Sequence, residues 1–386
     1  MTKKKIAVFH SSNDLYGASK IMLQVVDTLI KEGYEIHVFL TYNGPLNEIF
    51  EAKKIKLNIL NFGVFRRKYF NFFGIINRIF KITSSIKIIN KYLRTHKIDL
   101  VYTSTSIILA GAISAKLNKI PNYFHIHEIP NNKIYLKITG SIVSYLSSKV
   151  IVVSKSVEDH WKKYLKNTSV SLIYNGISFK SNRIDVNIKS NDFKILTVAR
   201  LIPYKGHIYL INLARKLLIK HPNLMFLIIG DTFKGYEDYE KKLKTLVNDY
   251  GLNDNIIFKG FKNDVSKYLE SSSFLLHPSI DPDSLPTVLF EAVNSLLPII
   301  ATNRGGAVEI LDNGKGGLLI PHDNLDLAVK LIEVYISNLD LQKEKKEYAY
   351  TYMLSNFSEQ KFNENIIKFF KPLKILFFLF LNYKKK

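Results

Sequence analysis

The sequence predicts an α/β protein with two domains, each built on a parallel sheet. The first observation behind this prediction is length: 386 residues exceed one ordinary hydrophobic core, so two domains of roughly 180 residues are expected. The second is alternation, because short apolar segments and helix-like patterns follow one another along both halves of the chain. Polar loops follow the apolar segments. This arrangement is typical of doubly wound sheets with helices on both faces.

The first half begins with a predicted strand, Lys5 to His10, a polar loop, and a helix with its apolar side chains on one face over 18–30. Later strands are predicted over 36–40, 99–104, 122–128, 149–154 and the start of 170–177, with helices over 107–117 and 156–163. Ligands of such sheets lie beyond the carboxyl ends of the strands, so Ser11, Asn13 and Gly17 are expected to line a cleft. A single glycine in such a loop is also compatible with a purely structural turn.

The strand over 122–128 carries two histidines at alternate positions, so His125 and His127 point to the same face. Two histidines at this spacing can bind a metal ion, but no third ligand is nearby in the sequence, and we predict no metal site. A histidine at a strand end is either a hydrogen-bonded structural residue or a catalytic group. Sequence alone favours the structural role.

The second half is expected to begin after a polar linker, with strands over 195–199, 223–231, 256–261, 274–276, 299–301 and 317–323. Arg200 and Lys205 follow the first of these strands and precede a helix that starts near Ile208. Two cations at a strand-to-helix loop can clamp a phosphate group. Basic residues at strand ends are also common in a chain with a formal net charge of +22.

The stretch over 274–309 is the most informative part of the chain. An apolar segment ends at His277-Pro278-Ser279, and a loop with Asp281 and Asp283 follows. Ser284 is predicted to cap a helix over 285–296, on which Thr287 and Glu291 share a polar side. A second apolar segment then ends at Gly305-Gly306, where backbone N–H groups can approach an anion at a helix start.

The acid at 283, the seven intervening residues, Glu291 and the Gly-Gly-x-x-Glu loop together resemble the retaining glycosyltransferases of family 4. The resemblance implies the GT-B fold, in which two Rossmann-like domains face a central cleft. It implies domains over 1–178 and 193–355, a linker over 179–192, and a C-terminal helix and basic tail over 356–386 that pack back on the first domain.

The resemblance also implies roles for individual residues. Arg200 and Lys205 bind the diphosphate of a UDP- or GDP-linked sugar, Asp283 the sugar hydroxyls and Glu291 the ribose, while His127 faces the donor sugar. Asn175 lies at the crossover between domains. Further substrate-binding positions are Gly17, Gly260, Phe261, Ser284, Leu285, Thr287, Gly305 and Gly306. Phe261 is either a stacking partner for the base or a core residue, and core packing is the simpler interpretation. No cofactor or metal is implied.

The positive charge belongs mostly to the first half, and residues 53–97 contain 12 Lys and Arg and no acid, interleaved with aromatic residues. Three interpretations compete: an interfacial membrane surface, ordinary helices packed on the sheet, and a nucleic-acid surface. Aromatic density favours an anionic membrane, and no nucleic-acid motif is present. The tail after Lys368 is basic, and its apolar segment over 375–381 is too short to span a bilayer.

Zero cysteines exclude a disulfide framework, and the N-terminus shows no signal peptide, so we expect a cytoplasmic protein on the inner face of the plasma membrane. The predicted function is hexosyl transfer from a nucleotide sugar to a saccharide acceptor, polyprenyl-diphosphate-linked, in capsule, O-antigen or exopolysaccharide synthesis. Two alternatives remain: a nucleotide-sugar 2-epimerase of the same fold, and a non-catalytic basic adaptor on a membrane.

Overall fold

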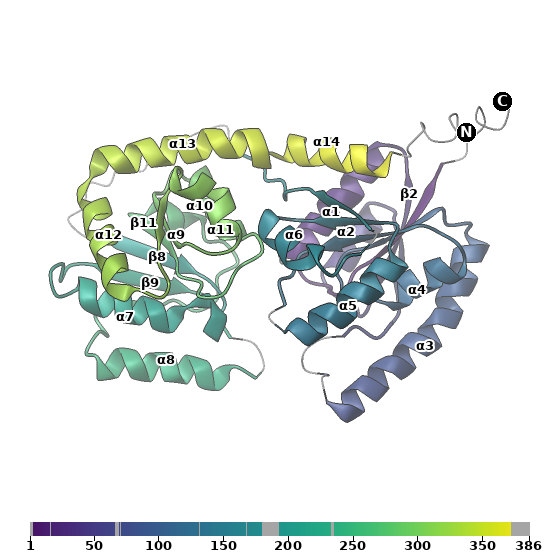
Figure 1. The fold of residues 1–386 in the computed structure, drawn as a ribbon, viewed down its shortest axis with the longest axis horizontal. Coiled ribbons are helices and arrows are strands. Elements are labelled where there is room, and N and C mark those ends of the chain that lie inside the picture. The colour runs from purple at the N-terminus through teal and green to yellow at the C-terminus, as the bar shows by residue number, and fades with distance from the viewer. Residues whose placement is uncertain are drawn as a thin grey trace. The chain divides into compact units, whose positions relative to one another are not determined.

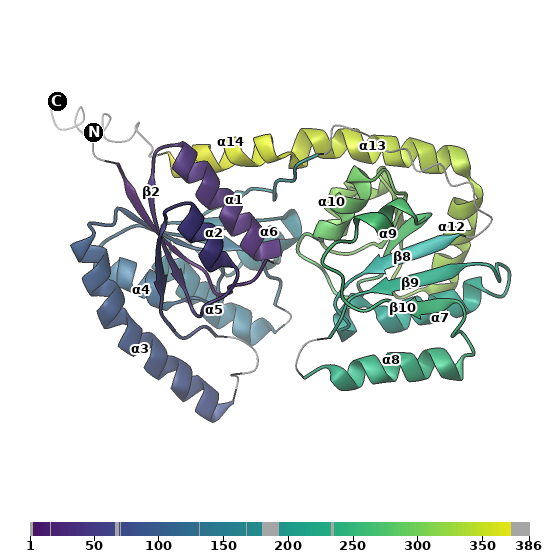
Figure 2. The ribbon, with the colours of Figure 1, turned by 180° about the vertical axis from the view of Figure 1, so that it is seen from behind.

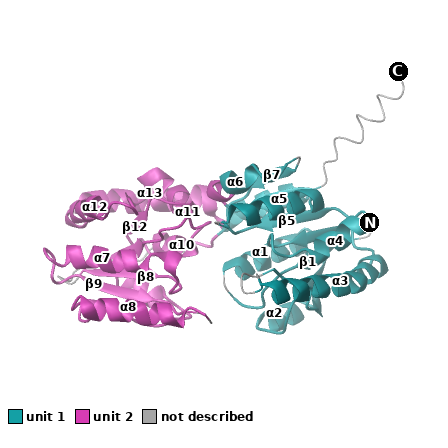
Figure 3. Cartoon of the chain, turned by 60° about the horizontal axis from the view of Figure 1, so that its bottom comes forward, with its two compact units in different colours: residues 1–153, 158–176, 359–386 teal, residues 154–157, 177–358 magenta. Residues whose placement is uncertain are grey.

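The computed structural model is drawn as a ribbon in Figure 1 and from behind in Figure 2. It describes residues 3–371 apart from 16, 66–68, 70, 131, 167, 180–192 and 233–234. The expected linker from residue 180 onward, Tyr16 and the tail after Lys371 therefore lie outside the described residues. The chain forms two compact units (Figure 3): unit 1 comprises 1–153, 158–176 and 359–386, and unit 2 comprises 154–157 and 177–358.

In the described part of unit 1, one parallel sheet has the strand order β3-β2-β1-β4-β5-β6-β7. Register follows directly from the pairings, for example Val8 opposite Val38 on one side and opposite Tyr102 on the other. The strands are β1 (Lys5–Phe9), β2 (Glu35–Leu40), β3 (Lys56–Ile59), β4 (Leu100–Thr103), β5 (Asn122–Ile126), β6 (Lys149–Val152) and β7 (Ser169–Leu172).

Helices cover both faces of this sheet, so alternate residues of β1 enter different cores. Ile6 and Val8 pack with one set of helices, whereas Ala7 and Phe9 pack with the other. The first set contains α1 (Gly17–Lys31), α2 (Leu46–Ala52) and α14 (Glu359–Phe370), and the second contains α3 (Phe72–Thr95) and α4 (Ala110–Leu117). Helix α5 (Lys133–Leu146) contacts α4, and α6 (Lys155–Lys162) lies between β6 and β7 in the chain.

The described part of unit 2 has a parallel sheet in the order β10-β9-β8-β11-β12-β13. Its strands are β8 (Lys194–Val198), β9 (Met225–Ile229), β10 (Ile256–Phe258), β11 (Phe274–His277), β12 (Ile299–Thr302) and β13 (Leu318–Ile320). Its helices are η2 (Pro203–Lys205), α7 (His207–Leu217), α8 (Glu237–Asp249), α9 (Ser266–Glu270), α10 (Thr287–Asn294), α11 (Gly306–Ile310), η3 (Asp312–Gly314), α12 (Leu325–Ser337) and α13 (Leu339–Phe357).

The last described helix returns to unit 1 after the chain has completed unit 2. Phe362, Ile366, Phe369 and Phe370 of α14 are buried in the core of unit 1 that also holds α1. Thr28 Oγ1 of α1 donates a hydrogen bond to Asn363 Oδ1 at 2.8 Å. Unit 1 is therefore assembled from segments at both ends of the sequence.

Both sheets are parallel and doubly wound, so the predicted fold class is confirmed. Helices α2, α5 and α13 and strand β3 were not predicted from the sequence. The prediction that Ser284 caps a helix was wrong. Helix α10 begins at Thr287 with Pro286 in the cap position, and no side chain caps it. Ser284 instead belongs to the loop that precedes the helix, because Pro286 fixes an extended backbone there.

Candidate functional site

Unit 2 has its topological switch point between β8 and β11, where the order of the strands along the chain reverses. β11 pairs with both β8 and β12, so the loops after these three strands leave the same edge of the sheet. Open α/β sheets bind ligands at this place. The candidate residues Arg200 and Lys205, Asp283, and the Gly305-Gly306 pair lie on these three loops in turn.

The loops after β8 and β11 bring together a cation and a carboxylate, beside an imidazole at the end of β11. Lys205 Nζ and Asp283 Oδ2 form a largely buried ion pair, and Nε2 of buried His277 lies 3.6 Å from the same oxygen. Burial opposes ionisation of Asp283, but the Lys205 ammonium, together with His277 and the Ser284 N–H, outweighs it and holds the Asp283 pKa below its usual value. Burial lowers the pKa of His277 to about 4. At neutral pH, the imidazole is therefore uncharged beside a compensated ion pair.

The glycine pair is required by a close approach of two backbones. A Cβ added to Gly305 would lie 2.3 Å from the carbonyl oxygen of Asp283, and one added to Gly306 would lie 2.3 Å from that of Ser284. Gly306 N donates to Asp283 O at 2.7 Å, so the expectation that this N–H group approaches an anion is wrong. Gly305 also has φ of +59° and ψ of −149°, a region essentially restricted to glycine. The loop after β12 thus positions the loop that carries Asp283.

Other candidates lie on the same edge of the sheet. Arg200 is exposed directly after β8, and Gly260 O, after β10, accepts from Gly230 N at 3.1 Å. Phe261 is 48% exposed, so the simpler expectation of core packing is wrong. Its side chain therefore lies partly at the surface of unit 2.

Helix α10 follows the loop with Asp283 and presents two candidate polar residues. Thr287 is exposed and Glu291 half-buried, one turn apart, whereas Leu289, Ala292 and Val293 face the core. Leu285, before the helix, is buried. The backbones of Asp283 and Ser284 lie close to the glycine pair. Glu291 lies on α10, the helix that follows this loop.

Unit 1 has its own switch point between β1 and β4, and His127 follows β5 at the same edge of the sheet. The rings of His125 and His127 lie 4.1 Å apart, and His125 Nδ1 is 2.6 Å from Tyr102 Oη. Burial lowers the pKa of His127 to about 4. Among described residues, His127 Nε2 is buried and has no hydrogen-bond partner.

Two polar networks at this edge were not found from the sequence. Glu128 Oε1 accepts from Thr105 Oγ1 and from Ser106 N, both at 2.8 Å. His10 contacts Ser104 Oγ at 2.5 Å through Nδ1 and Ser19 Oγ at 3.0 Å through Nε2. Only their positions could have indicated these networks, because the residues follow or lie beside the carboxyl ends of β1, β4 and β5.

Gly17 and Asn175 occupy different places in unit 1. Gly17 is the first residue of α1, after the loop that follows β1. Asn175 follows the edge strand β7 and is buried, and its Oδ1 lacks a hydrogen-bond partner among described residues. A Cβ on the next residue, Gly176, would lie 2.5 Å from Phe362 Cβ of α14. The Asn-Gly turn therefore fits closely against the returning helix.

Within the described residues, no three His, Asp or Glu side chains form a group that could hold a metal ion. The described helices also include none long and apolar enough to cross a membrane.

Comparison with solved structures identifies the class of fold. The Anabaena protein HepE, solved in complex with UDP and glucose, matches with a TM-score of 0.78 at 21% identity, over 96% of this chain and 100% of that one. The two doubly wound units thus have the GT-B fold. The family described as "Glycosyltransferase Family 4" matches residues 16–180, and "Glycosyl transferases group 1" matches 178–352. The chain belongs to these family 4, group 1 glycosyltransferases and is an enzyme of the transferase class.

Two relatives of named activity match most of the chain. A UDP-Gal:alpha-D-GlcNAc-diphosphoundecaprenol alpha-1,3-galactosyltransferase of Escherichia coli is 24% identical over 86% of this chain and 87% of its own length. A capsular polysaccharide biosynthesis glycosyltransferase, CapH of Staphylococcus aureus, is 27% identical over 73% of this chain and 77% of its own.

Proposed function

We propose that this glycosyltransferase moves a hexose from a nucleotide diphosphate sugar to a saccharide acceptor with retention of the anomeric configuration. The observation that carries the proposal is the meeting of Lys205, Asp283 and the Gly305-Gly306 loop at the switch point of unit 2. This site combines a cation and the positive end of a helix dipole, which suits a leaving diphosphate.

The main demand on such a site is to stabilise the negative charge that develops on the leaving diphosphate. Lys205 and exposed Arg200 supply positive charge, and α11 adds the positive end of its helix dipole. Asp283, ionised because its pKa is held low by Lys205, accepts hydrogen bonds from sugar hydroxyls. When the donor binds, the Lys205 ammonium interacts with the phosphate and less strongly with Asp283.

The remaining contacts position the nucleotide. We assign half-buried Glu291 to the ribose, because a carboxylate can accept from both hydroxyls, and partly exposed Phe261 to stacking on the base. Ser284, Leu285 and Thr287 shape the loop and first turn below the sugar. UDP is the first donor nucleotide to test, because HepE was solved with UDP and glucose, and GDP is the second.

In unit 1, the neutral His127 imidazole is assigned to a hydroxyl of the donor sugar, and Gly17 and Asn175 to the substrate side of the same edge. No carboxylate is assigned as a covalent nucleophile, so the paired carboxylates of glycoside hydrolases do not provide the mechanism. We assign the leaving diphosphate as the base that takes the proton of the attacking hydroxyl, which keeps departure and attack on the same face of the sugar.

The acceptor is proposed to be a saccharide linked to polyprenyl diphosphate in cell-surface polysaccharide synthesis. The galactosyltransferase activity named for the Escherichia coli relative and the capsular role named for the Staphylococcus aureus relative support this assignment. A lipid-linked acceptor requires the enzyme at a membrane, so we place it peripherally on the cytoplasmic face of the plasma membrane. The basic, aromatic segment over 53–97 supports that location.

The donor site is tested by thermal shift with UDP, GDP and their sugars. At a ligand concentration about 100 times Kd, stabilisation should approach roughly 2.7 kcal/mol. Lys205→Ala and Glu291→Ala should abolish the shift. Lys241→Ala and Glu344→Ala are matched controls, because both residues are exposed elsewhere on unit 2, and should keep it. No shift of wild type with any nucleotide refutes the proposal and favours the adaptor.

Transfer is tested with the nucleotide sugar so identified and a polyprenyl-diphosphate-linked saccharide. Proton NMR of the product should show the anomeric configuration of the donor. An inverted product refutes retention. Release of an epimerised nucleotide sugar without acceptor instead identifies the isomerase alternative.

A further inference from the structure

Helix α3 has an apolar row that the fold of unit 1 does not use. Its inward row, which includes Ile82, Ile89 and Leu93, is buried in the core with β1 and α4. The opposite row begins with side chains that are half to four-fifths exposed. We call these five residues the aromatic stripe: Phe72 (73%), Phe73 (80%), Ile76 (50%), Ile79 (51%) and Phe80 (69%).

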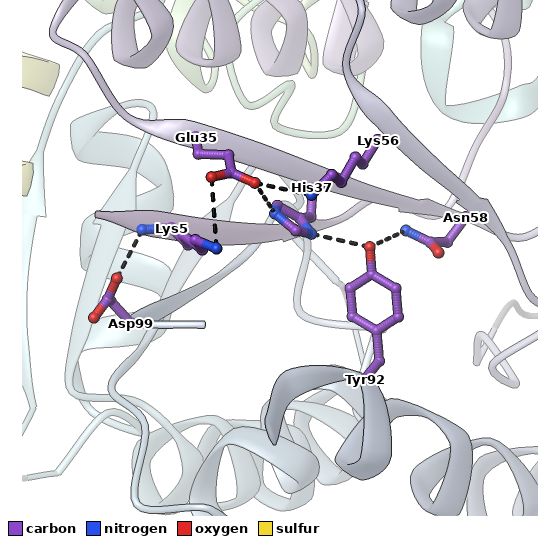
Figure 4. A network of polar contacts seen from close by, with 7 residues as sticks. All are labelled: Lys5, Glu35, His37, Lys56, Asn58, Tyr92 and Asp99. Atoms are coloured by element: carbon purple, nitrogen blue, oxygen red, sulfur yellow. Dashed lines mark hydrogen bonds and ion pairs between the residues drawn. The ribbon is translucent and has the colours of Figure 1, made fainter. Parts of the chain in front are cut away.

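The stripe is held outward because the far end of α3 is fastened to the sheet (Figure 4). Tyr92 Oη lies 2.9 Å from His37 Nδ1 and accepts from Asn58 Nδ2 at 3.1 Å. The buried His37 ring also contacts Glu35 Oε1 at 3.0 Å through Nε2. These bonds tie the helix to β2 and β3. Rotating the stripe inward would break them and remove the inward row from the core.

A basic hollow continues the same helix toward its C-terminal end. It has a volume of about 440 Å³ and is lined by Lys87, Asn90, Lys91, Arg94 and Thr95. Lys87 is seven residues beyond Phe80, which is roughly 10 Å along a helix. No acid occurs from residue 53 to 97, so no carboxylate of this segment neutralises the hollow. A size and charge of this kind suit phosphate groups.

Helix α5 adds a second exposed apolar row in the same layer. Ile134, Ile138 and Tyr145 are 72%, 56% and 68% exposed, and Lys133 and Lys137 are exposed beside them. Helices α3, α4 and α5 cover one face of the sheet (Figures 1 and 2), with α4 contacting both neighbours. Apolar groups and cations therefore occur together on two helices of this layer.

We infer that the aromatic stripe and the basic hollow dock unit 1 on an anionic phospholipid bilayer, the stripe entering the interface and the hollow binding lipid phosphates. The positive charge of this surface favours an anionic bilayer as its partner. Exposed aromatic and apolar residues flanked by cations match the boundary between lipid headgroups and acyl chains. The stripe extends about 12 Å along the helix, enough for shallow insertion. The inference specifies the membrane partner of the proposed function and rests on it only for the lipid-linked acceptor.

Flotation with vesicles of phosphatidylglycerol and phosphatidylcholine tests the stripe. Wild type should bind, and the triple variant Phe72→Ser, Phe73→Ser, Phe80→Ser should bind about tenfold or more weakly, because binding scales with the apolar area inserted. The control is Ile219→Ser, Val334→Ser, Leu339→Ser. These three side chains are 79%, 63% and 70% exposed on unit 2, and their loss should leave binding unchanged.

The hollow is tested by Lys87→Gln, Lys91→Gln and Arg94→Gln. Each charge removed should weaken binding to anionic vesicles about fivefold, and binding to pure phosphatidylcholine should not change. Lys241→Gln, Lys330→Gln and Lys343→Gln remove three exposed lysines from unit 2 and should have little effect. Wild-type binding should also fall as salt is raised.

Other occupants give different results. Vesicle binding that survives both sets of substitutions overturns the inference, and so does an aromatic stripe that holds a stable dimer, seen by sedimentation velocity, without any vesicle binding. Titration with inorganic phosphate tests whether the hollow binds free phosphate and not lipid phosphate. Saturation of the hollow by free phosphate, with no vesicle binding, also overturns the inference. The UDP shift is measured on every variant, so failure of membrane docking is separated from failure of the donor site.

Discussion

The close approach of Gly305 to Asp283 allows a sharp test of how the donor loop is positioned. In Gly305→Ala, the new Cβ would lie 2.3 Å from the Asp283 carbonyl oxygen, against an ordinary contact of at least 3.4 Å. The two loops must therefore separate by about 1.1 Å, and the 2.7 Å bond from Gly306 N to Asp283 O lengthens or breaks. The backbone conformation itself adds strain of about 1–3 kcal/mol.

Gly251→Ala is the matched control, because Gly251 has a φ of +66° but no atom within 4 Å of an added Cβ. It should lose about 1–2 kcal/mol of unfolding free energy, measured by urea denaturation, from the left-handed backbone alone. A displacement of 1 Å in a positioning loop can cost about 100-fold in rate. We expect UDP affinity, measured by calorimetry, to fall at least about tenfold in Gly305→Ala and to stay unchanged in Gly251→Ala.

The reasoning is refuted if folded Gly305→Ala binds UDP as wild type does. Circular dichroism establishes that the variant is folded before affinity is compared. Gly306→Ala is a second test of the loss of UDP affinity, since its added Cβ would lie 2.3 Å from the Ser284 carbonyl oxygen. Gly306 lacks the positive φ of Gly305, so this variant tests the close approach alone.

Three further predictions concern ionised and hydrogen-bonded groups. Lys205→Met should raise the pKa of Asp283, followed by carbon-13 NMR of its carboxyl group, and an unchanged pKa would contradict the pairing. The hydrogen bond from Lys56 lowers the Glu35 pKa from 4.5 to about 2, so this carboxylate stabilises the fold above pH 4.5 and the contribution disappears as pH falls toward 2. Glu35→Gln should accordingly differ from wild type in unfolding free energy at neutral pH and converge with it in acid, and a constant difference would argue against it. Tyr92→Phe should lower the unfolding free energy by about 1–3 kcal/mol, because the bonds to His37 and Asn58 are lost; no loss in urea denaturation would mean that they add nothing.

Strands were predictable where their apolar side chains are buried on both faces of a sheet. Segments such as 5–9 and 299–302 are short, uninterrupted and almost wholly buried, which is the pattern of parallel strands. β3 was missed because, as an edge strand, it has only partly buried and exposed residues. Helix α5 was missed because apolar residues on its exposed side, such as Ile134 and Ile138, obscure the helical period.

The meeting of Lys205, Asp283 and the glycine pair at one edge of the sheet could be expected, because each follows a predicted strand and parallel topology carries strand ends to the same edge. The sequence also placed a glycine pair where two backbones approach. It could not reveal that His277 lies 3.6 Å from Asp283, because that distance depends on the path of the loop between them. The Ser284 cap failed for a related reason: Pro286, two residues later, sets where the helix can begin.

The return of α14 to unit 1 has a consequence for synthesis on the ribosome. The buried partners of Phe362, Ile366, Phe369 and Phe370 are made first, yet residue 359 follows residue 176 only after all of 177–358. At about 5–20 residues per second, the delay is roughly 10–35 s. During that interval the nascent unit 1 exposes an apolar groove between its helices, and a chain that stops before Glu359 never covers it. Premature termination should therefore produce a species that chaperones bind, although every residue of the donor site is already present.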